Sequence, residues 1–333
     1  MRRSVKLLAA AGLLVAGGLV TERTAIGRMR RHEDPDLDEL LDLPDGVERR
    51  DIASHDGGTL HLLEKGEGRP IVLLHGITLQ GSIWSPQFHQ LADTHRVIAC
   101  DLRGHGRSEA GTDGFGLDML ARDLRTVLET LDLREAIVVG HSMGGMAIMQ
   151  FCGDHTDVLD KRVAGLAFVA TAADPVVPEP VIGAIRRFSG YSVSRIETGR
   201  RVLHYKWRDN DVSWLLCRLA FGREPTAKAV EQVRSMISSV GPESFQPSFA
   251  GILVHDAREA LEATDIPSVV VVGTRDLLTP VASARGIAAL MPHAELHVLR
   301  DAGHQIMQER PNELAEILLD LEATIRRHDA SHR

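Results

Sequence analysis

A serine set between glycines is the residue of this sequence best placed for covalent chemistry. Ser142 stands in the stretch VVGHSMGGMA, residues 138–147, and matches the pattern Gly-x-Ser-x-Gly. The apolar residues 136–139 before it are typical of a buried strand, and the apolar residues 146–149 after it open a helix. A sharp turn between them would project the Ser142 hydroxyl above a sheet, as in a nucleophile elbow. The alternative is a structural turn in which the serine caps the helix.

A histidine and an aspartate further along the chain could activate this serine. A serine hydroxyl is a weak nucleophile unless a base takes its proton, and a carboxylate must hold that base. His304 follows the strand-like residues 296–299, and Asp276 follows the apolar residues 269–272. Both would lie in loops at the carboxyl ends of strands, where open parallel sheets place their sites. The order Ser142, Asp276, His304 is the order of a triad on such a sheet.

The anionic oxygen formed by attack on a carbonyl needs preorganised N–H donors. The Met143 amide directly follows the serine and is the first candidate. The second donor is expected in the loop after an early strand. Residues 71–74 precede His75, Gly76 and Ile77. We assign the Ile77 amide, because Gly76 permits a tight backbone there, and we expect His75 to support this loop and not to act as a base.

These residues need a sheet to hold them in place. Apolar runs without polar alternation are typical of strands that are buried on both faces. Such runs occupy residues 71–74, 97–100, 136–139, 164–169 and 268–272. Residues 117–131 have the apolar spacing of a one-sided helix, and residues 47–54 and 59–63 flank a Gly-rich turn that predicts a hairpin. Because strand and helix alternate, the predicted fold class is α/β with a mostly parallel sheet.

Composition narrows the class of protein. The chain has 333 residues, a formal net charge of −8 and no long basic block, which argues against a nucleic-acid-binding protein. Cys100, Cys152 and Cys217 are widely spaced, show neither a zinc nor a disulfide pattern, and are expected to be small buried residues. No group of His, Asp and Glu has the spacing of a metal site, and acyl transfer by a serine needs no cofactor.

The beginning of the chain differs from the rest. Residues 1–6 are basic, and residues 7–20 carry no charge. This apolar run suits a signal peptide better than a membrane span, which needs about 20 apolar residues, although no clear cleavage site follows. We therefore expect residues 1–27 to form a signal or anchor segment and the protein to be exported or membrane-associated, with a helix packed on the domain as the alternative. Residues 28–46, charged and with two prolines, are expected to be a linker.

Five stretches together resemble the motifs of the α/β-hydrolase superfamily, in its esterase and lipase part. They are residues 75–76, 101–108, 140–145, 273–276 and 303–304. The resemblance covers about residues 47–325 and implies helices on both faces of the sheet, a Ser–Asp–His triad and no cofactor. Some relatives place the acid one strand earlier, which makes Asp174 the alternative to Asp276. Ser142 at the nucleophile position argues against the dehalogenase and epoxide-hydrolase branches, which use an aspartate there.

The alternation of strand and helix breaks between about residues 174 and 254. Both tyrosines and two of the three tryptophans fall in this stretch. We expect a helical cap at residues 175–252, between a first part of the core at residues 47–174 and a second part at residues 253–333. The Trp207 and Trp214 side chains would either line the acyl pocket or pack the cap onto the core.

The sequence thus predicts a serine hydrolase that takes a small ester with an apolar acyl or alcohol part and forms an acyl-enzyme. A C–C bond hydrolase and a cofactor-free perhydrolase would use the same triad and are the alternatives within the fold. A peptidase of the aminopeptidase type would need an acidic site for the substrate amine, and the sequence shows none. A non-catalytic binding protein on this fold is disfavoured, because such proteins usually lose a triad residue.

Overall fold

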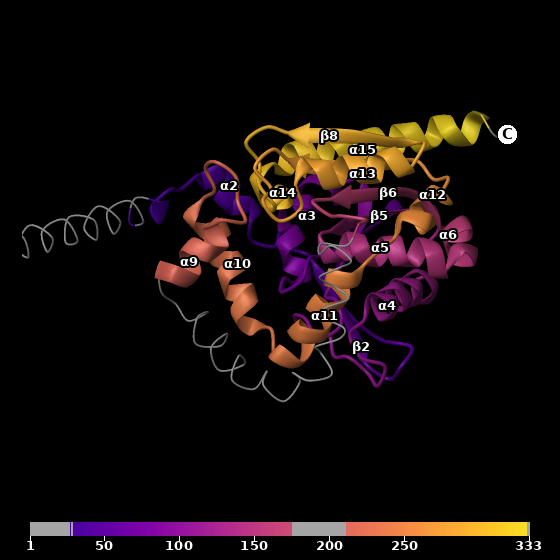
Figure 1. The fold of residues 1–333 in the computed structure, drawn as a ribbon, viewed down its shortest axis with the longest axis horizontal. Helices are drawn as coiled ribbons and strands as arrows, with labels where there is room; N and C mark the ends of the chain where they lie inside the picture. Colours follow the sequence, from indigo (N-terminus) through magenta and orange to yellow (C-terminus); the bar gives the residue numbers. More distant parts are fainter. Residues whose placement is uncertain (1–26, 28, 175–210, 332–333) are drawn as a thin grey trace, which may run out of the picture.

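The apolar runs of the sequence form one eight-stranded sheet (Figure 1). The computed structural model describes residue 27, residues 29–174 and residues 211–331. The strands are β1 (Glu48–Ala53), β2 (Thr59–Lys65), β3 (Arg69–Leu74), β4 (His95–Cys100), β5 (Ala136–His141), β6 (Val163–Val169), β7 (Ser268–Gly273) and β8 (Ala294–Leu299). Their order across the sheet is β1-β2-β4-β3-β5-β6-β7-β8. The pairs β1–β2 and β2–β4 are antiparallel and the other pairs are parallel, which confirms the predicted hairpin and fold class.

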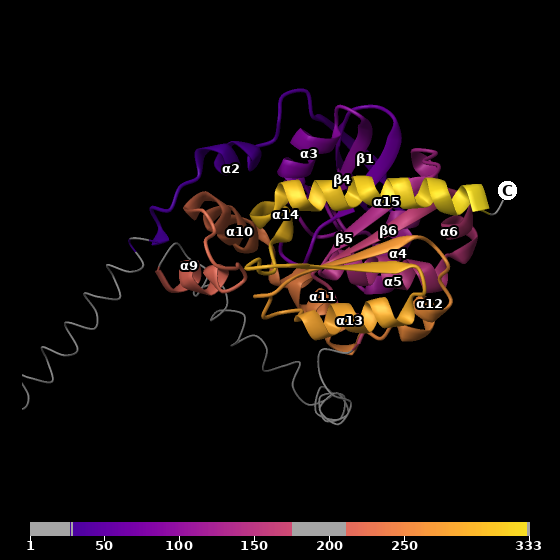
Figure 2. The ribbon, with the colours of Figure 1, turned by 90° about the horizontal axis from the view of Figure 1, so that it is seen from above.

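Helices cover both faces of this sheet, which is why its central strands lack polar alternation. In β3, Ile71 and Leu73 point to one face and Val72 and Leu74 to the other, and all four are buried. The first face packs against α3 (Ser85–Leu91) and α15 (Pro311–Ser331). The second packs against α4 (Leu117–Thr130), α5 (Met143–Asp154) and α13 (Val281–Leu290), so α15 and α13 flank the sheet in Figure 2.

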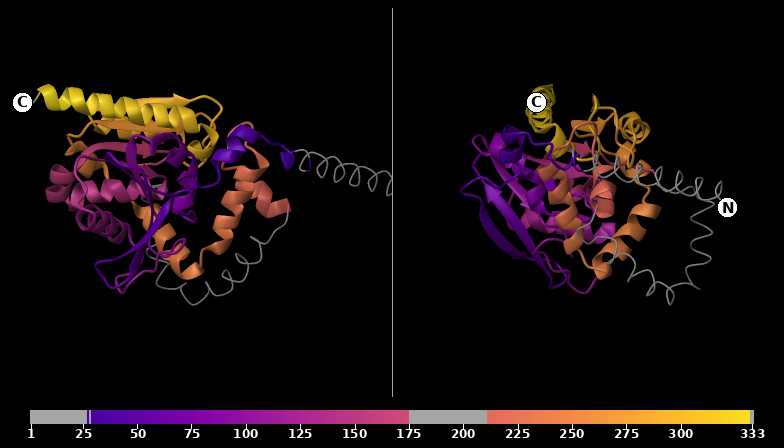
Figure 3. Two further views of the ribbon diagram at one scale, coloured as in Figure 1. Left: turned by 180° about the vertical axis from the view of Figure 1, so that it is seen from behind. Right: turned by 90° about the vertical axis from the view of Figure 1, so that its left-hand side faces the viewer.

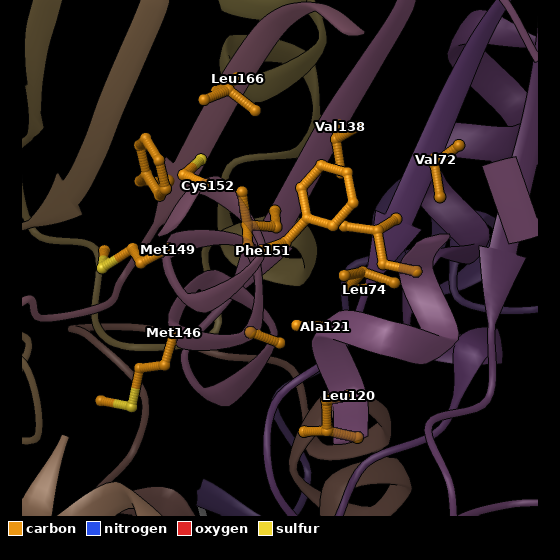
Figure 4. Packing of buried hydrophobic residues seen from close by; sticks show 14 of the residues in the cluster. Val72, Leu74, Leu120, Ala121, Val138, Met146, Met149, Phe151, Cys152 and Leu166 are labelled. Carbon is orange, nitrogen blue, oxygen red and sulfur yellow. The ribbon is translucent and has the colours of Figure 1, made fainter. Parts of the chain in front are cut away.

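The core on the second face is continuous from the sheet into α4 and α5. Val72, Leu74 and Val138 of the sheet belong to the same buried cluster as Leu120 of α4 and Met146 of α5 (Figure 4). The apolar face predicted for residues 117–131 is therefore the face that α4 buries. This packing fixes the position of α5, whose first turn begins directly after Ser142.

The described part of the expected cap, residues 211–252, is helical and contains no strand, and its last helix runs on to Val254. It comprises α9 (Asp211–Arg218), α10 (Ala227–Ser239) and α11 (Pro242–Val254). A Cβ added to Gly104, in the loop after β4, would lie 2.6 Å from the Ser244 hydroxyl of α11. The His304 amide, in the loop after β8, donates to the Ala220 carbonyl at 2.8 Å. Helix α11 and the connection after α9 therefore contact loops at the carboxyl edge of the sheet. The start of the expected cap, with Trp207, lies outside the described residues.

The described part of the segment expected to be a linker, residues 29–46, packs on the protein. It carries helix α2 (Pro35–Leu40), which Asp34 caps by accepting from the Leu37 amide. The Leu41 side chain is 1% exposed, and the Leu41 main-chain carbonyl accepts from the side-chain Nε2 of Gln232 in α10 at 3.1 Å. Figure 3 shows α2 beside the cap helices. This packing could not be seen in the sequence, because a single buried leucine after a charged stretch gives no periodic signal.

The remaining elements of the described part of the chain are four short helices. They are η1 (Gly81–Trp84), α6 (Thr156–Arg162), α12 (Arg258–Glu262) and α14 (Ile306–Glu309). Among the described residues, no helix has both the length and the apolar character that crossing a membrane requires. The apolar residues 7–20, on which the signal or anchor expectation rests, lie outside the described residues.

Candidate active site

Ser142 occupies a strained turn between β5 and α5. Its φ of 52° and ψ of −117° lie in the region that favours glycine, at a cost of order 1–3 kcal/mol for other residues. The turn is held by a bond from the Ser142 amide to the Val169 carbonyl at 3.0 Å and by a bond from the Thr171 hydroxyl to the Ser142 carbonyl at 2.8 Å. The Ser142 side chain makes no capping hydrogen bond to α5. The structure therefore does not support the helix-cap alternative for this serine.

The structure brings Asp276 and His304 together. His304 Nδ1 lies 2.9 Å from Asp276 Oδ2, and both residues are buried. An ionised carboxylate only accepts, so Nδ1 carries the proton and Nε2 of the neutral ring is left as an acceptor. Burial alone would raise the pKa of Asp276, but His304 and the hydrogen bonds from Thr279 lower it below its ordinary value. The acid is thus ionised and holds the imidazole in the tautomer that a general base needs.

Thr279 is a site residue that the sequence reasoning missed. Its hydroxyl donates to Asp276 Oδ2 at 2.8 Å, and its amide donates to Oδ1 at 2.9 Å. The Leu278 amide donates to the same Oδ1 at 2.9 Å. The carboxylate is therefore fixed by its own loop before it meets His304. A signal was available, because Asp commonly accepts from amides two and three residues ahead in a turn.

His141 links the serine turn to the histidine loop. Its Nε2–H donates to the His304 carbonyl at 2.9 Å, and the two ring centroids are 4.7 Å apart. Burial, with a contribution from His304, holds the pKa of His141 well below its usual range, so the ring is neutral. His141 thus contacts the candidate base directly and precedes the candidate nucleophile by one residue.

The loop after β3 lies against the serine. A Cβ added to Gly76 would be 3.0 Å from Ser142 Cβ and 2.8 Å from His141 Nδ1, so only glycine fits there without a shift. His75 Nδ1 donates to the Gly76 carbonyl at 2.7 Å, and its Nε2 accepts from the Leu102 amide at 2.9 Å. Burial, together with the neighbouring His105, lowers the pKa of His75 to about 3. His75 is therefore a neutral support of this loop, in which Ile77 directly follows Gly76.

Met143, the other assigned amide, is the first residue of α5 and is buried. The first amides of a helix have no acceptor within the helix and lie at its positive end. The Met143 N–H is thus available beside Ser142. With Ile77 on the facing loop, the arrangement matches what an oxyanion site needs, and the assignment of both donors remains a prediction.

Asp174, the alternative acid, lies elsewhere. Its side chain is 55% exposed and pairs with Arg258 at 3.5 Å. Trp214 is 3% exposed and packs in the core cluster on the α15 face, with the Arg30 guanidinium 5.4 Å from its ring centroid. The structure thus favours the packing explanation for Trp214.

Three potential metal ligands, none of them a triad candidate, come together near the hairpin of β1 and β2. Ligand atoms of His55, Asp56 and Asp113 lie within 4.8 Å of one another, a grouping that the sequence spacing did not indicate. The Asp56 carboxylate, however, accepts from the buried Arg103 guanidinium at 3.0 Å, and Arg103 also binds Asp123 at 2.6 Å. The group is therefore arranged as an ion-pair network around an arginine.

A cavity of about 900 Å³ lies between α2, the start of α10 and the start of α15. Asp34, Thr226 and Asn312 are among its lining residues. Ser142, Asp276 and His304 do not line it. It is therefore not the pocket in which an acyl group would meet the serine.

His255 is a buried histidine that does not belong to the candidate active site. Its protonation makes the free energy of unfolding depend on pH. Its side chain is 3% exposed, and burial lowers its pKa from 6.5 to about 4. The neighbouring Asp256 binds Arg258 at 2.5 Å. Since the unfolded chain takes up the His255 proton at a higher pH than the folded chain, its contribution to stability is present above pH 6.5 and is lost as the pH falls towards 4.

Replacing this histidine should therefore flatten the acid slope of stability. In His255→Gln, the free energy of unfolding should fall less steeply between pH 6.5 and pH 4, by up to about 1.4 kcal/mol per pH unit. Urea unfolding at several pH values measures this slope. His293→Gln, which replaces a half-exposed histidine, is the control and should keep the wild-type slope. Equal slopes in wild type and His255→Gln would contradict the assignment.

Comparison with known proteins places the chain in a family. Residues 69–311 match the model of a family described as alpha/beta hydrolase fold. The chain is 30% identical over 261 residues to the non-heme chloroperoxidase CPO-A1 of Kitasatospora aureofaciens, covering 76% of this chain and 91% of that protein. It is also 30% identical over 240 residues to the pimeloyl-(acyl-carrier protein) methyl ester esterase of Chromobacterium violaceum, covering 72% and 88%. A thermophilic esterase from Thermogutta terrifontis superposes with a TM-score of 0.69 at 26% identity, covering 84% of this chain and 99% of that one. The family match spans more than half of the sequence, and so the chain belongs to the alpha/beta hydrolase family of enzymes.

Proposed function

We propose that this enzyme hydrolyses carboxylic esters with an apolar acyl or alcohol part through an acyl-enzyme on Ser142. The observation that carries the proposal is the 2.9 Å contact between His304 Nδ1 and the buried Asp276, which leaves Nε2 as a proton acceptor. The strained turn at Ser142 and the esterases among the similar proteins support it.

The reaction has two acyl-transfer steps. The Ser142 hydroxyl attacks the ester carbonyl carbon while His304 Nε2 takes its proton. The Met143 and Ile77 amides bind the resulting oxyanion, and its collapse expels the alcohol, which receives the proton from His304. Water then attacks the acyl-enzyme, again giving its proton to His304. The carboxylic acid leaves as Ser142 regains its hydroxyl proton, and Asp276 stays ionised throughout.

A second acceptor for the acyl group is hydrogen peroxide. The relative from Kitasatospora aureofaciens is named a non-heme chloroperoxidase. An acyl-enzyme attacked by peroxide instead of water releases a peracid, and a peracid can oxidise a halide. The same triad would serve both reactions without a cofactor, so perhydrolysis is our second candidate function.

Where the enzyme works is part of the proposal. The basic residues 1–6 and the uncharged residues 7–20 support export or attachment to a membrane. A substrate with an apolar part is consistent with either place. The formal net charge of −8 gives no support to a nucleic-acid partner.

Turnover of p-nitrophenyl esters tests the function. We expect the full chain to hydrolyse the acetate, butyrate and hexanoate esters with saturation kinetics. If the acyl chain is buried, each added methylene contributes about 0.8 kcal/mol, or roughly fourfold in kcat/KM, until the pocket is filled. A folded enzyme that turns over none of these esters would contradict ester hydrolysis, and a kcat/KM that falls with every added methylene would contradict an apolar pocket. Peracid formed from acetate and hydrogen peroxide reports the second candidate function.

A further inference from the structure

Glu309, at the end of α14, binds the main chain on both sides of His304. Its Oε1 accepts from the Gly303 amide at 3.0 Å and from the Gln305 amide at 3.2 Å. These two amides belong to the residues that directly precede and follow the histidine. A carboxylate oxygen with two such donors fixes the direction in which the loop presents the residue between them.

The other oxygen of the same carboxylate binds the cap. Glu309 Oε2 accepts from the Gly222 amide at 2.6 Å. Gly222 lies in the connection between α9 and α10, 87 residues away in the sequence. One side chain therefore joins the histidine loop to the cap connection.

The two segments also pair directly with each other. The His304 amide donates to the Ala220 carbonyl at 2.8 Å, and the Arg223 amide donates to the Asp301 carbonyl at 2.9 Å. A Cβ added to Gly303 would lie 2.4 Å from the Gly222 nitrogen, so the two backbones touch where neither residue has a side chain. The histidine loop thus rests on the cap connection along its whole length, and Glu309 closes the contact from one side.

The Glu309 carboxylate is partly buried and accepts from three main-chain amides. Burial raises the pKa of Glu309 above its ordinary value, although the three amides that it binds act in the opposite direction. Burial and hydrogen bonding thus oppose each other at this group, and the loss of one of these bonds would leave a main-chain N–H unpaired, at a cost in stability. The Glu309 carboxylate also fixes geometry, because both of its oxygens accept hydrogen bonds from the three amides. A neutral glutamine side chain has only one oxygen that can accept.

We propose that Glu309 is a positioning residue, which holds the main chain around His304 and couples the position of this histidine to the cap connection at Gly222. The proposal rests on the proposed function, in which His304 is the general base. A shift of the main chain at Gly222 would then move the main chain around His304, because Glu309 is bonded to both segments. We call the three hydrogen bonds of Glu309 to residues 222, 303 and 305 the clamp. While these bonds are made, the imidazole of His304 stays aligned with Asp276.

The test is the substitution Glu309→Gln, with Glu313→Gln as the matched control. Glutamine keeps the size of the side chain, but it replaces one oxygen by an NH₂ group that would face an N–H donor. Either the Gly222 bond or the two loop bonds must be lost. Glu313 lies four residues further on in α15, is 52% exposed and pairs only with Arg310 in the described structure, at 3.3 Å.

We expect kcat of Glu309→Gln to fall roughly 10- to 100-fold, which a small misplacement of a catalytic group produces, with KM near the wild-type value. The thermal midpoint should fall by a few degrees, because at least one main-chain N–H loses its acceptor, and the variant should still be folded at the assay temperature. Glu313→Gln should match wild type in all three. Wild-type kcat in Glu309→Gln would overturn the proposal. So would a fall in kcat that matches an equal fall in the folded fraction at the assay temperature, since this indicates a merely structural role.

Amide hydrogen exchange tests the clamp without using the reaction. In Glu309→Gln, the amides of residues 303–305 and of residues 222–223 should exchange faster than in wild type, both segments together, whereas Glu313→Gln leaves them unchanged. Unchanged exchange in both segments would overturn the coupling. If the wild-type protein hydrolyses no ester, the proposed function fails, and the exchange measurement still decides whether the clamp exists.

Discussion

Replacing Ser142 with alanine is expected to abolish ester hydrolysis, with a loss of at least about 10⁴-fold in kcat, because the hydroxyl oxygen is the atom that forms the acyl bond. Initial rates with p-nitrophenyl butyrate measure this loss. The fold should survive, since the Ser142 side chain makes no capping bond to α5 and the bonds that hold the turn come from its main chain. Thermal unfolding checks that the variant is native.

Covalent labelling separates the loss of a nucleophile from a general loss of activity. A fluorophosphonate probe should modify the wild-type chain at Ser142 and leave Ser142→Ala unmodified, as read by mass spectrometry. Ser239→Ala, at the end of α10, removes a hydroxyl whose partners among the described residues are the Gln80 side chain and the Met236 carbonyl, and it should keep both turnover and labelling. Labelling of Ser142→Ala at wild-type level would show that another residue is the nucleophile.

The sheet could be predicted because its signals are local. Runs of apolar residues at 71–74, 97–100 and 136–139 all became strands, and the hairpin before them followed from its Gly-rich turn. The strands are longer than these runs. Arg69 begins β3 and His95 begins β4, and the two are partners in the parallel ladder. Their place in the sheet comes from pairing with a neighbour distant in sequence, which no local pattern contains.

The contacts that position the site were not predictable for the same reason. The sequence indicated which residues would follow the carboxyl ends of β5, β7 and β8, and the structure places Asp276 against His304. The sequence did not indicate the role of Glu309, because the bond from Gly222 to this carboxylate joins segments that are 87 residues apart. The ion pairs of Arg103 with Asp56 and Asp123 are equally non-local. Chain order predicts which loops share an edge, but it does not predict which side chains meet there.

The second large expected effect is on kcat, and it decides whether Asp276 or Asp174 is the acid that orients His304. Asp276→Asn should lower kcat roughly 10⁴-fold, because the imidazole would be held in the wrong tautomer. The structure explains why asparagine cannot simply turn to restore the bond. Asp276 Oδ1 accepts from the Leu278 and Thr279 amides, each at 2.9 Å, and only the oxygen of an asparagine can take that place.

The NH₂ group of the introduced asparagine would then occupy the position of Oδ2 and face His304 Nδ1, which is 2.9 Å from Oδ2 in the wild type. Nδ1 would have to accept, the ring proton would move to Nε2, and Nε2 could no longer take the proton of Ser142. Asp174→Asn is the matched control, since Asp174 is 55% exposed and pairs with Arg258, and it should change kcat by less than about twofold. Rates for both variants with the same ester, alongside thermal unfolding, decide the matter. A large loss in Asp174→Asn with near-normal Asp276→Asn would mean that the acid acts from the end of β6 and that the Asp276–His304 contact is not the catalytic one.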